Sequence, residues 1–402
     1  MEILYVSHCV PWPPDKGDRI RAFHSVRELT GHHRVHLACL ARSPQEAAAI
    51  SDLSGKCASL HIEVLDLPRA IVRGLFRFAL GDSFTTSFYS SPKLQAHVRS
   101  VMASRPIGAV VLLSPGMAAY EPEGIPFIAD WGDVDSEKWF DYAKVRFPGF
   151  AYRLEAGRLR RMEHDCAVRS RRAFFTTPNE LQLFQRIAPE APAACAGNGV
   201  DTDFFDPAAG FDTPANLVGR KFLVFVGMLN YFPNSDGVCW FAENIYPELR
   251  RRDPELDLLL VGRNPTRNVA DLARIDGVTV TGAVADVRPY LAAARGVVVP
   301  LRIARGIQNK VLEALAMGKQ VLASEEVCRT FMPDLPQGIL RCRSADDYAS
   351  AAATLPTVVA PDAGIAQAAR SRFGWAANLA PLLAELVRIE RENMPRQAGG
   401  SS

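Results

Sequence analysis

The chain has 402 residues, which is more than one compact domain usually holds and enough for two. Hydrophobic residues make up 48% and charged residues 22%, so the chain can bury large cores and does not have the composition of a disordered protein. The 46 basic residues almost balance the 44 acidic ones, which argues against a protein that neutralises nucleic-acid phosphates and predicts no nucleic-acid partner.

The cysteines and the apolar runs indicate the compartment. The eight cysteines form no Cys-x-x-Cys pair and no cluster with histidine, so neither a zinc site nor a redox pair is encoded locally. The first residues lead directly into a strand-like run without the features of a secretion signal. No uncharged stretch reaches the roughly 20 apolar residues of a membrane span. We therefore expect a cytoplasmic protein.

Short apolar runs alternate with longer amphipathic segments along the whole chain, which is typical of parallel sheets covered by helices on both faces. Strands are predicted at 3–10, 35–41, 62–67, 108–114 and 125–130, and then at 221–227, 256–262, 278–282, 296–301 and 319–324. The expected fold class is α/β, with two Rossmann-like domains facing each other across a cleft at the carboxyl ends of their strands.

The turn-rich stretch 199–216 is predicted to link the two domains, which we place at 1–208 and 217–370. A last helical segment over 371–390 is expected to pack back on the first domain. The tail 391–402 is expected to be disordered.

The segment 300–324 carries the most specific pattern in the chain. A strand ends at Pro300, a loop carries Arg302, Arg305 and Gly306, and a helix is predicted to open near Gln308 and to stop at Gly318. Free backbone N–H groups at such a helix start, flanked by cations, attract a diphosphate.

Two side chains near the start of this helix are candidates for ligand contacts. Lys310 adds a positive charge next to Asn309, and Glu313 lies three residues further along the same face, where it could accept hydrogen bonds from ribose hydroxyls. The alternative is a solvated loop with a Lys310–Glu313 surface pair.

This segment resembles the donor site of the retaining glycosyltransferases of family four, which have the GT-B fold and transfer a sugar from a nucleotide diphosphate sugar. The stretches 198–207, 225–236, 260–265 and 280–290 agree in the family's order. The opening 8–21 and the stretch 133–139 are most similar to the sugar transferases of exosortase (PEP-CTERM) exopolysaccharide systems.

The resemblance implies further donor contacts and also shows two departures. It places the base against backbone near Val284, with Arg263 in the same pocket, and leaves UDP and GDP open. Of the family's two glutamates, Glu313 matches the second, whereas Arg305 stands at the first. The stretch from Gly227 to residue 236 lacks the family's basic pair, so Lys310, Arg302 and Arg305 are expected to supply that charge.

In the first half, the loop 11–18 is the first candidate for cleft contacts. Gly17 has no side chain to keep a phosphate or sugar away, and the resemblance assigns Gly17 and Asp18 to the donor side of the cleft. A stiff proline turn is the alternative reading. His8 ends the first strand, where it either faces the cleft or belongs to the core.

Acidic residues follow the predicted strand at 125–130. Asp133 is the first candidate for contacting the acceptor, because a carboxylate there can orient a hydroxyl or accept its proton. Asp135 is also a candidate helix N-cap. Asp133 and Asp135 together resemble a D-x-D metal-binding motif. Because a helix terminus and cations are expected to neutralise the leaving group, we expect no metal and no cofactor beyond the donor substrate.

Two stretches suggest contact with a membrane. Residues 69–80 place Arg69, Arg73 and Arg77 among apolar residues, as in a short basic amphipathic helix. Residues 144–172 carry nine Lys or Arg against three acidic residues. Solvated helix faces are the alternative, but the resemblance implies a glycan or lipid-linked acceptor, which favours a peripheral position at an anionic membrane surface on the inner face.

The leading hypothesis is therefore a metal-independent retaining glycosyltransferase of exopolysaccharide biosynthesis, in which Lys310 stabilises the leaving group. One alternative is a sugar-nucleotide epimerase of the same fold. Another is a non-catalytic nucleotide-sugar-binding protein, suggested by Arg305 and the missing basic pair. A dehydrogenase is disfavoured because neither half carries the glycine fingerprint.

Overall fold

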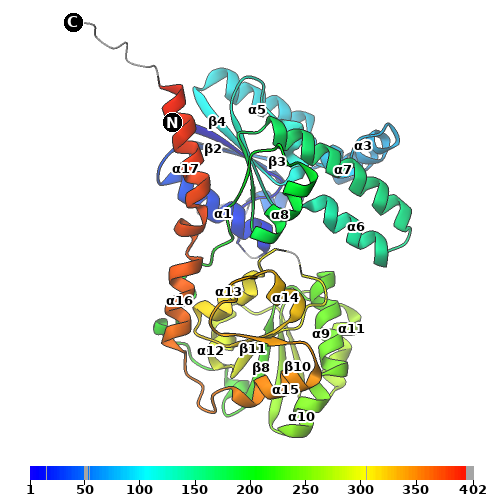
Figure 1. Cartoon of the computed structure of the whole chain (residues 1–402), viewed down its shortest axis with the longest axis vertical. Helices are drawn as coiled ribbons and strands as arrows, with labels where there is room; N and C mark the ends of the chain where they lie inside the picture. Colours follow the sequence, from blue (N-terminus) through cyan, green and yellow to red (C-terminus); the bar gives the residue numbers. More distant parts are fainter. Residues whose placement is uncertain (15, 49–52, 54, 305, 395–402) are drawn as a thin grey trace, which may run out of the picture. The chain divides into compact units, whose positions relative to one another are not determined.

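The chain forms two compact units, Met1–Gly197 with Asn378–Ser402 and Asn198–Ala377 (Figure 1). This is a computed structural model, and it describes residues 1–14, 16–48, 53, 55–304 and 306–394. Each unit is built around one parallel sheet, so the chain is an α/β protein with two Rossmann-like domains.

The first unit contains a seven-stranded parallel sheet in the order β3-β2-β1-β4-β5-β6-β7. The central strands read as continuous apolar runs because helices cover both faces of the sheet. The strands are β1 (Glu2–Ser7), β2 (Arg34–Ala41), β3 (Ser59–Val64), β4 (Ile107–Leu113), β5 (Phe127–Gly132), β6 (Arg172–Phe175) and β7 (Ala193–Cys195).

Alternate residues of β1 show how this sheet is buried. Leu4 and Val6 belong to the apolar cluster on one face, and Ile3 and Tyr5 to the cluster on the other, as the two-residue period of a strand requires. The covering helices are α1 (Gly17–Thr30), α2 (Pro44–Ala48), α3 (Leu67–Ala79), α4 (Phe84–Tyr89), α5 (Pro92–Ser104), the 3₁₀ turn η1 (Pro115–Tyr120), α6 (Asp135–Val145), α7 (Gly149–Arg169) and α8 (Pro178–Ile187).

The second unit contains a six-stranded parallel sheet in the order β10-β9-β8-β11-β12-β13. Its strands are β8 (Lys221–Val226), β9 (Leu256–Val261), β10 (Val278–Gly282), β11 (Gly296–Val299), β12 (Val321–Ser324) and β13 (Ile339–Cys342). Its helices are α9 (Phe232–Asn244), α10 (Tyr246–Arg252), α11 (Arg267–Asp271), α12 (Arg288–Ala293), α13 (Asn309–Ala316), α14 (Glu325–Arg329), α15 (Ala345–Thr354) and α16 (Ala363–Phe373), with 3₁₀ turns η2 (Pro207–Ala209), η3 (Ala215–Leu217) and η4 (Leu272–Arg274).

The boundary between the units differs from the expected one. Residues 198–208, assigned above to the first domain, belong to the second unit, as does the expected linker. The N–H of Val200 donates to Phe373 O at 2.8 Å, and Arg288 Nη1 donates to Phe204 O at 3.0 Å. These contacts tie the stretch to the second core, because Val200 is itself buried there.

The C-terminal helix also differs in its limits. The expected single helix over 371–390 is divided at Gly374, where α16 ends and α17 (Trp375–Asn393) follows. Leu382, Leu386 and Ile389 of α17 pack into the apolar cluster of the first unit that contains Ile3. The helix includes 391–393, part of the tail expected to be disordered, and 395–402 lie outside the described residues.

Within the described ranges, no helix combines the length and the hydropathy needed to cross a lipid bilayer.

Candidate functional site

The start of α13 is the first candidate contact for an anion in the second unit. The N-cap residue Gln308 is extended and its side chain does not cap the helix, so the first-turn N–H groups receive no acceptor from it. Gly306 is buried with a φ of 63°, a conformation that favours glycine. The helix ends at Ala316, and Gly318 follows it with a φ of 66°, so both ends lie within two residues of the predicted positions.

Lys310 lies over the end of β8. Its Nζ donates to Gln308 Oε1 at 3.3 Å and stands 5.7 Å from the centre of the Phe225 ring. A Cβ at Gly227 would lie 3.2 Å from Lys310 Cε, so the glycine provides the room for the lysine stem. Among the described residues, no carboxylate lies within ion-pair distance of this ammonium group.

Burial perturbs the two ionisable groups near the start of α13, Lys310 and Glu313. It lowers the pKa of Lys310, although the negative charge of Glu313 opposes that shift. It raises the pKa of Glu313, although the positive charge of Lys310 opposes that shift. A partly buried cation without a full counter-charge is a favourable place for a phosphate oxygen.

Two asparagines near Lys310 carry buried oxygens that find no hydrogen-bond partner in the described residues. They are Oδ1 of Asn309, the first residue of α13, and Oδ1 of Asn234 in α9. The amide nitrogen of Asn234 donates to Met228 O at 2.8 Å, which fixes the orientation of that side chain. Both oxygens can accept hydrogen bonds from sugar hydroxyls. Sequence reasoning missed Asn234, whose only local signal is its position after β8.

Gly227, Arg263 and Val284 follow the adjacent strands β8, β9 and β10. The loops after β8 and β9 touch, since the N–H of Leu229 donates to Arg263 O at 3.1 Å and a Cβ at Gly262 would collide with Gly227 O. The structure thus brings these three predicted positions to one edge of the sheet.

Neither Arg302 nor Arg305 is established as an unpaired cation in the way that Lys310 is. Arg302 Nη1 lies 3.4 Å from Asp236 Oδ1, so part of its charge is already offset. Arg305 lies outside the described residues. The expected contribution of both arginines to the diphosphate site stays a prediction.

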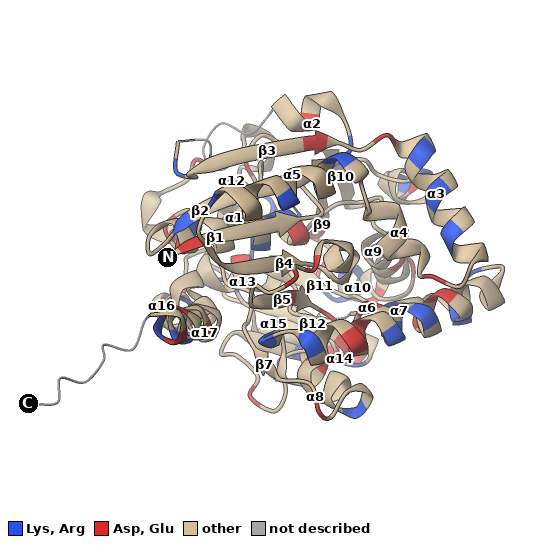
Figure 2. Ribbon diagram, turned by 90° about the horizontal axis from the view of Figure 1, so that it is seen from above, with Lys and Arg blue, Asp and Glu red and all other residues tan. Residues whose placement is uncertain are grey.

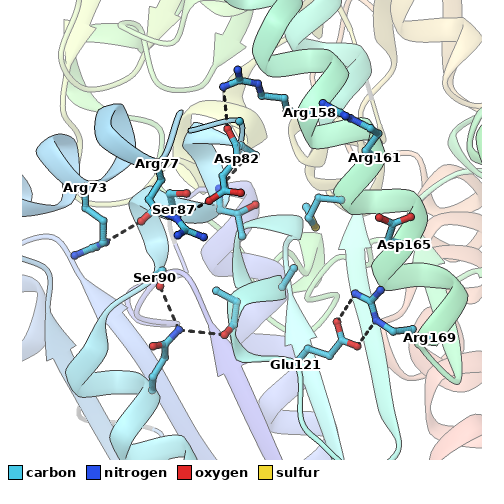
Figure 3. Close-up of a pocket in the computed structure, with 17 residues that line it drawn as sticks. Arg73, Arg77, Asp82, Ser87, Ser90, Glu121, Arg158, Arg161, Asp165 and Arg169 are labelled. Carbon is cyan, nitrogen blue, oxygen red and sulfur yellow. Dashed lines mark hydrogen bonds and ion pairs between the residues drawn. The ribbon is translucent and has the colours of Figure 1, made fainter. Parts of the chain in front are cut away.

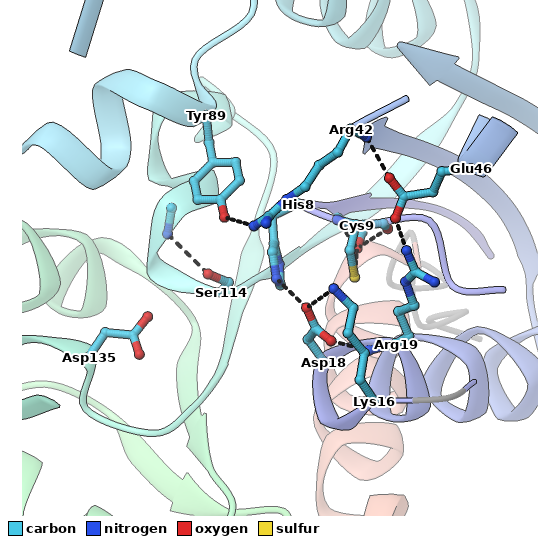
Figure 4. A network of polar contacts seen from close by, with 12 residues as sticks. His8, Cys9, Lys16, Asp18, Arg19, Arg42, Glu46, Tyr89, Ser114 and Asp135 are labelled. Atoms are coloured by element: carbon cyan, nitrogen blue, oxygen red, sulfur yellow. Dashed lines mark hydrogen bonds and ion pairs between the residues drawn. The ribbon is translucent and has the colours of Figure 1, made fainter. Parts of the chain in front are cut away.

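In the first unit, Asp18 is the centre of a polar network after β1 (Figure 4). Its Oδ2 lies 3.4 Å from His8 Nε2 and 3.5 Å from Lys16 Nζ, and its Oδ1 accepts the N–H of Arg19 at 2.9 Å. Burial would raise the pKa of Asp18, but the hydrogen bond from His8 and the nearby positive charges lower it well below its usual range. Gly17 begins α1 beside this carboxylate.

His8, Cys9 and Asp18 are the three potential metal ligands that lie together in the part of the chain that the structure describes, with their ligand atoms within 4.8 Å of one another. Burial raises the pKa of the Cys9 thiol to about 12, which keeps its proton, and the ammonium group of Lys16 already neutralises Asp18. The ammonium group of Lys16 would compete with a divalent cation for the carboxylate of Asp18. Nδ1 of His8 is buried without a partner among the described residues, and its ring meets Tyr89 edge-on at 5.6 Å.

Asp133 follows β5 at the same edge of the first sheet. Its Oδ1 accepts a hydrogen bond from Thr176 Oγ1 at 3.0 Å, and its side chain is 25% exposed. A hydroxyl can donate to the second lone pair of Oδ1 or to Oδ2, which lies 4.0 Å from Lys138 Nζ.

Asp135 is not the N-cap of α6. The helix begins at Asp135 and its N-cap is Val134, whose N–H donates to Glu180 Oε2 at 2.8 Å. The N–H of Ser136 donates to Glu163 Oε1 at 3.1 Å. Side-chain oxygens of Glu163 in α7 and Glu180 in α8 therefore accept hydrogen bonds at the start of the helix, which local sequence could not show.

Residues 220–357, about a third of the chain, match the family model "Glycosyl transferases group 1". No curated protein sequence matches the chain significantly.

Solved structures resemble nearly the whole chain. Sucrose-phosphate synthase from Thermosynechococcus elongatus is 16% identical with a TM-score of 0.69, covering 98% of this chain and all of that one. HepE of Anabaena, solved in complex with UDP-glucose, is 12% identical with a TM-score of 0.66, covering 96% and 100%. α,α-Trehalose 6-phosphate synthase from Burkholderia multivorans is 12% identical with a TM-score of 0.63, covering 98% and 100%. The fold is thus that of the GT-B glycosyltransferase structures, as predicted.

Proposed function

We propose that the chain is a retaining glycosyltransferase that transfers a sugar from a nucleotide diphosphate sugar to a glycan or lipid-linked acceptor. The observation that carries this proposal is the partly buried Lys310 at the uncapped start of α13, beside Gly227 and within the segment that matches the family model.

Lys310 and the first-turn N–H groups of α13 would bind the diphosphate and stabilise the charge that develops on it as the glycosidic bond breaks. Because these groups supply positive charge without an ion, the proposed reaction is metal-independent. The acceptor hydroxyl would attack from the face that the leaving group occupies, which retains the anomeric configuration.

The nucleoside would lie at the edge formed by Arg263 and Val284, and the unpaired oxygens of Asn309 and Asn234 would accept hydrogen bonds from hydroxyls of the donor. We favour UDP over GDP as the nucleotide of the sugar donor, because HepE, a protein of similar fold, was solved in complex with UDP-glucose.

On the first unit, Asp133 would orient the acceptor hydroxyl and accept its proton. A lipid-linked acceptor of exopolysaccharide synthesis, and a peripheral position on the inner face of the membrane, are part of the proposal. They are supported by the apolar side chains that α3 exposes.

Thermal shift and calorimetry with UDP, GDP, UDP-glucose and a GDP-sugar test the donor site, because a ligand at 100 times its Kd stabilises the native state by about 2.7 kcal/mol. Transfer to a lipid-linked or glycan acceptor, with the product anomer read by NMR, tests the reaction. Binding without turnover on any acceptor would favour a non-catalytic binding protein, and isomerisation of the donor without acceptor would favour an epimerase. Absence of binding to every nucleotide would refute the proposal.

A further inference from the structure

The first unit contains an arginine-lined pocket that the proposed sugar chemistry does not use. It lies between α3, α4, η1 and α7 and has a volume of about 590 Å³ (Figure 3). Five arginines and three carboxylates line it: Arg73, Arg77, Arg158, Arg161, Arg169, Asp82, Glu121 and Asp165. We refer to it as the arginine pocket.

Three of these arginines are not neutralised by a carboxylate within the described residues. Arg73 donates to the carbonyls of Ser87 and Phe88 at 2.9 and 3.0 Å, and Arg158 donates to the carbonyl of Asp82 at 3.2 Å. Backbone carbonyls orient a guanidinium group but leave its charge in place. Arg161 makes no hydrogen bond or ion pair with the described part of the chain.

The other two arginines are paired. Arg77 lies 2.5 Å from Asp82, and Arg169 donates two hydrogen bonds to Glu121 at 2.6 and 2.8 Å. The arginine pocket therefore keeps an excess of positive charge with several free N–H donors. A guanidinium group binds a phosphate through two parallel N–H donors that point at two phosphate oxygens, so free arginine N–H groups favour a phosphate ligand.

One wall of the arginine pocket is α3, and the outward side of this helix is apolar. Val72 is 66% exposed and Phe76 is 63% exposed. Gly74 is on the opposite, buried side of α3, and a Cβ there would lie 2.7 Å from the Phe84 ring, so this side is packed closely against α4. The exposed apolar residues on or next to α3, called the apolar face here, are Leu67, Ile71, Val72, Leu75, Phe76 and Leu80.

The helix α3 has the two sides of the amphipathic helix that the sequence predicts, and its contact with a membrane stays a prediction. Arg73 and Arg77 line the arginine pocket, whereas the apolar face and Arg69 are exposed. In Figures 1 and 2, α3 and the turn between α6 and α7 project from the same side of the first unit. That turn exposes Phe147 and Phe150, and Arg146 lies next to them.

We propose that the arginine pocket binds the phosphate group of an anionic lipid while the apolar face of α3 lies among the acyl chains at the membrane surface. Such a lipid matches both features, since it joins a phosphate to an apolar chain, and a helix with a large apolar side stays at the interface. This inference rests on the proposed contact with a membrane but not on sugar transfer.

The test is flotation of the full chain with phosphatidylcholine vesicles, with and without phosphatidylglycerol. Wild-type protein is expected to float with the anionic vesicles and much less with phosphatidylcholine alone. In Arg161→Gln we expect the vesicle partition coefficient to fall at least tenfold. The matched control is Arg153→Gln, an exposed arginine on the same helix outside the arginine pocket. It should lose no more than about fivefold, the effect of one cation near an anionic surface.

The apolar contribution has its own matched pair. Val72→Ser should weaken flotation, whereas Val218→Ser, at a valine that is 69% exposed in the second unit, should not. Circular dichroism and thermal unfolding confirm that each variant is folded.

Several outcomes would overturn the proposal. Equal losses in Arg161→Gln and Arg153→Gln would assign binding to diffuse surface charge. Calorimetric binding of inorganic phosphate without any flotation would make the arginine pocket a site for a free anion. If the protein does not float with anionic vesicles, the proposal that the arginine pocket binds a lipid phosphate is refuted. None of these results changes the nucleotide-binding experiment, so a failure here is distinguishable from a failure of the proposed sugar transfer.

Discussion

Replacing Lys310 by alanine tests the proposed role of α13 most directly. The substitution removes a positive charge that is partly buried and that no carboxylate in the described residues pairs within ion-pair distance. We expect kcat to fall by about 10² to 10³, which corresponds to the loss of about 2.7–4 kcal/mol when one preorganised donor to a developing anion is removed.

This magnitude follows from the surroundings of the ammonium group. Two opposite charges 4 Å apart attract by about 4 kcal/mol at an effective dielectric of 20, a value suited to a group near the protein surface. Part of that energy is already present in the bound ground state, so only the remainder appears in kcat. Removing the lysine should change the free energy of unfolding by no more than about 1 kcal/mol, because its burial costs desolvation.

The assay is steady-state transfer at saturating concentration of the donor that binds best, with Lys221→Ala as the control. Lys221 lies in the same unit and forms an exposed ion pair with Glu255. Lys310→Arg, which keeps the charge, should recover part of the rate. A folded Lys310→Ala protein with kcat within threefold of wild type would refute the assignment of leaving-group stabilisation to this residue.

Three further predictions concern other parts of the molecule. Gly227→Ala places a Cβ 3.2 Å from Lys310 Cε and 3.0 Å from Asn234 Nδ2, so it should weaken donor binding, measured by calorimetry, with little change in Tm. Asp133→Asn should lower kcat at least 100-fold and leave donor affinity unchanged, as expected for a general base; an equal loss of donor affinity would contradict that role. Glu163 has a pKa raised to about 8 by burial, so the folded state holds its proton where the unfolded state releases it, and wild-type stability should fall as pH rises from about 5 to 8. Glu163→Gln should flatten this slope, of order 1 kcal/mol per pH unit, in urea unfolding at several pH values; an unchanged slope would exclude this group as its source.

Much of the fold could be predicted from sequence because strands buried on both faces are continuous apolar runs. The runs at 221–227, 256–262 and 296–301 correspond to β8, β9 and β11. Three strands were missed, β6, β7 and β13. They have only three or four residues, so their extended state depends on pairing with a neighbour rather than on a local pattern.

The candidate site was predicted in part. Gly306 and Gly318 bracket α13 in the sequence, and the resemblance directed attention to Lys310 and Gly227. Asn234 was missed because its closeness to Lys310 results from the packing of α9 beside the end of β8, which no spacing along the chain encodes.

The amino-acid sequence by itself determined the two-sheet α/β architecture and the start of α13, since both follow from local periodicity and from glycines at helix ends. Only the tertiary structure decided which way each amphipathic element faces. In α3, the contact of Gly74 with Phe84 and the backbone carbonyls that bind Arg73 hold one side of the helix against α4 and the arginine pocket, and the apolar side chains stay exposed. Periodicity shows that a helix has two faces, but the neighbours that bind one of them come from distant parts of the chain.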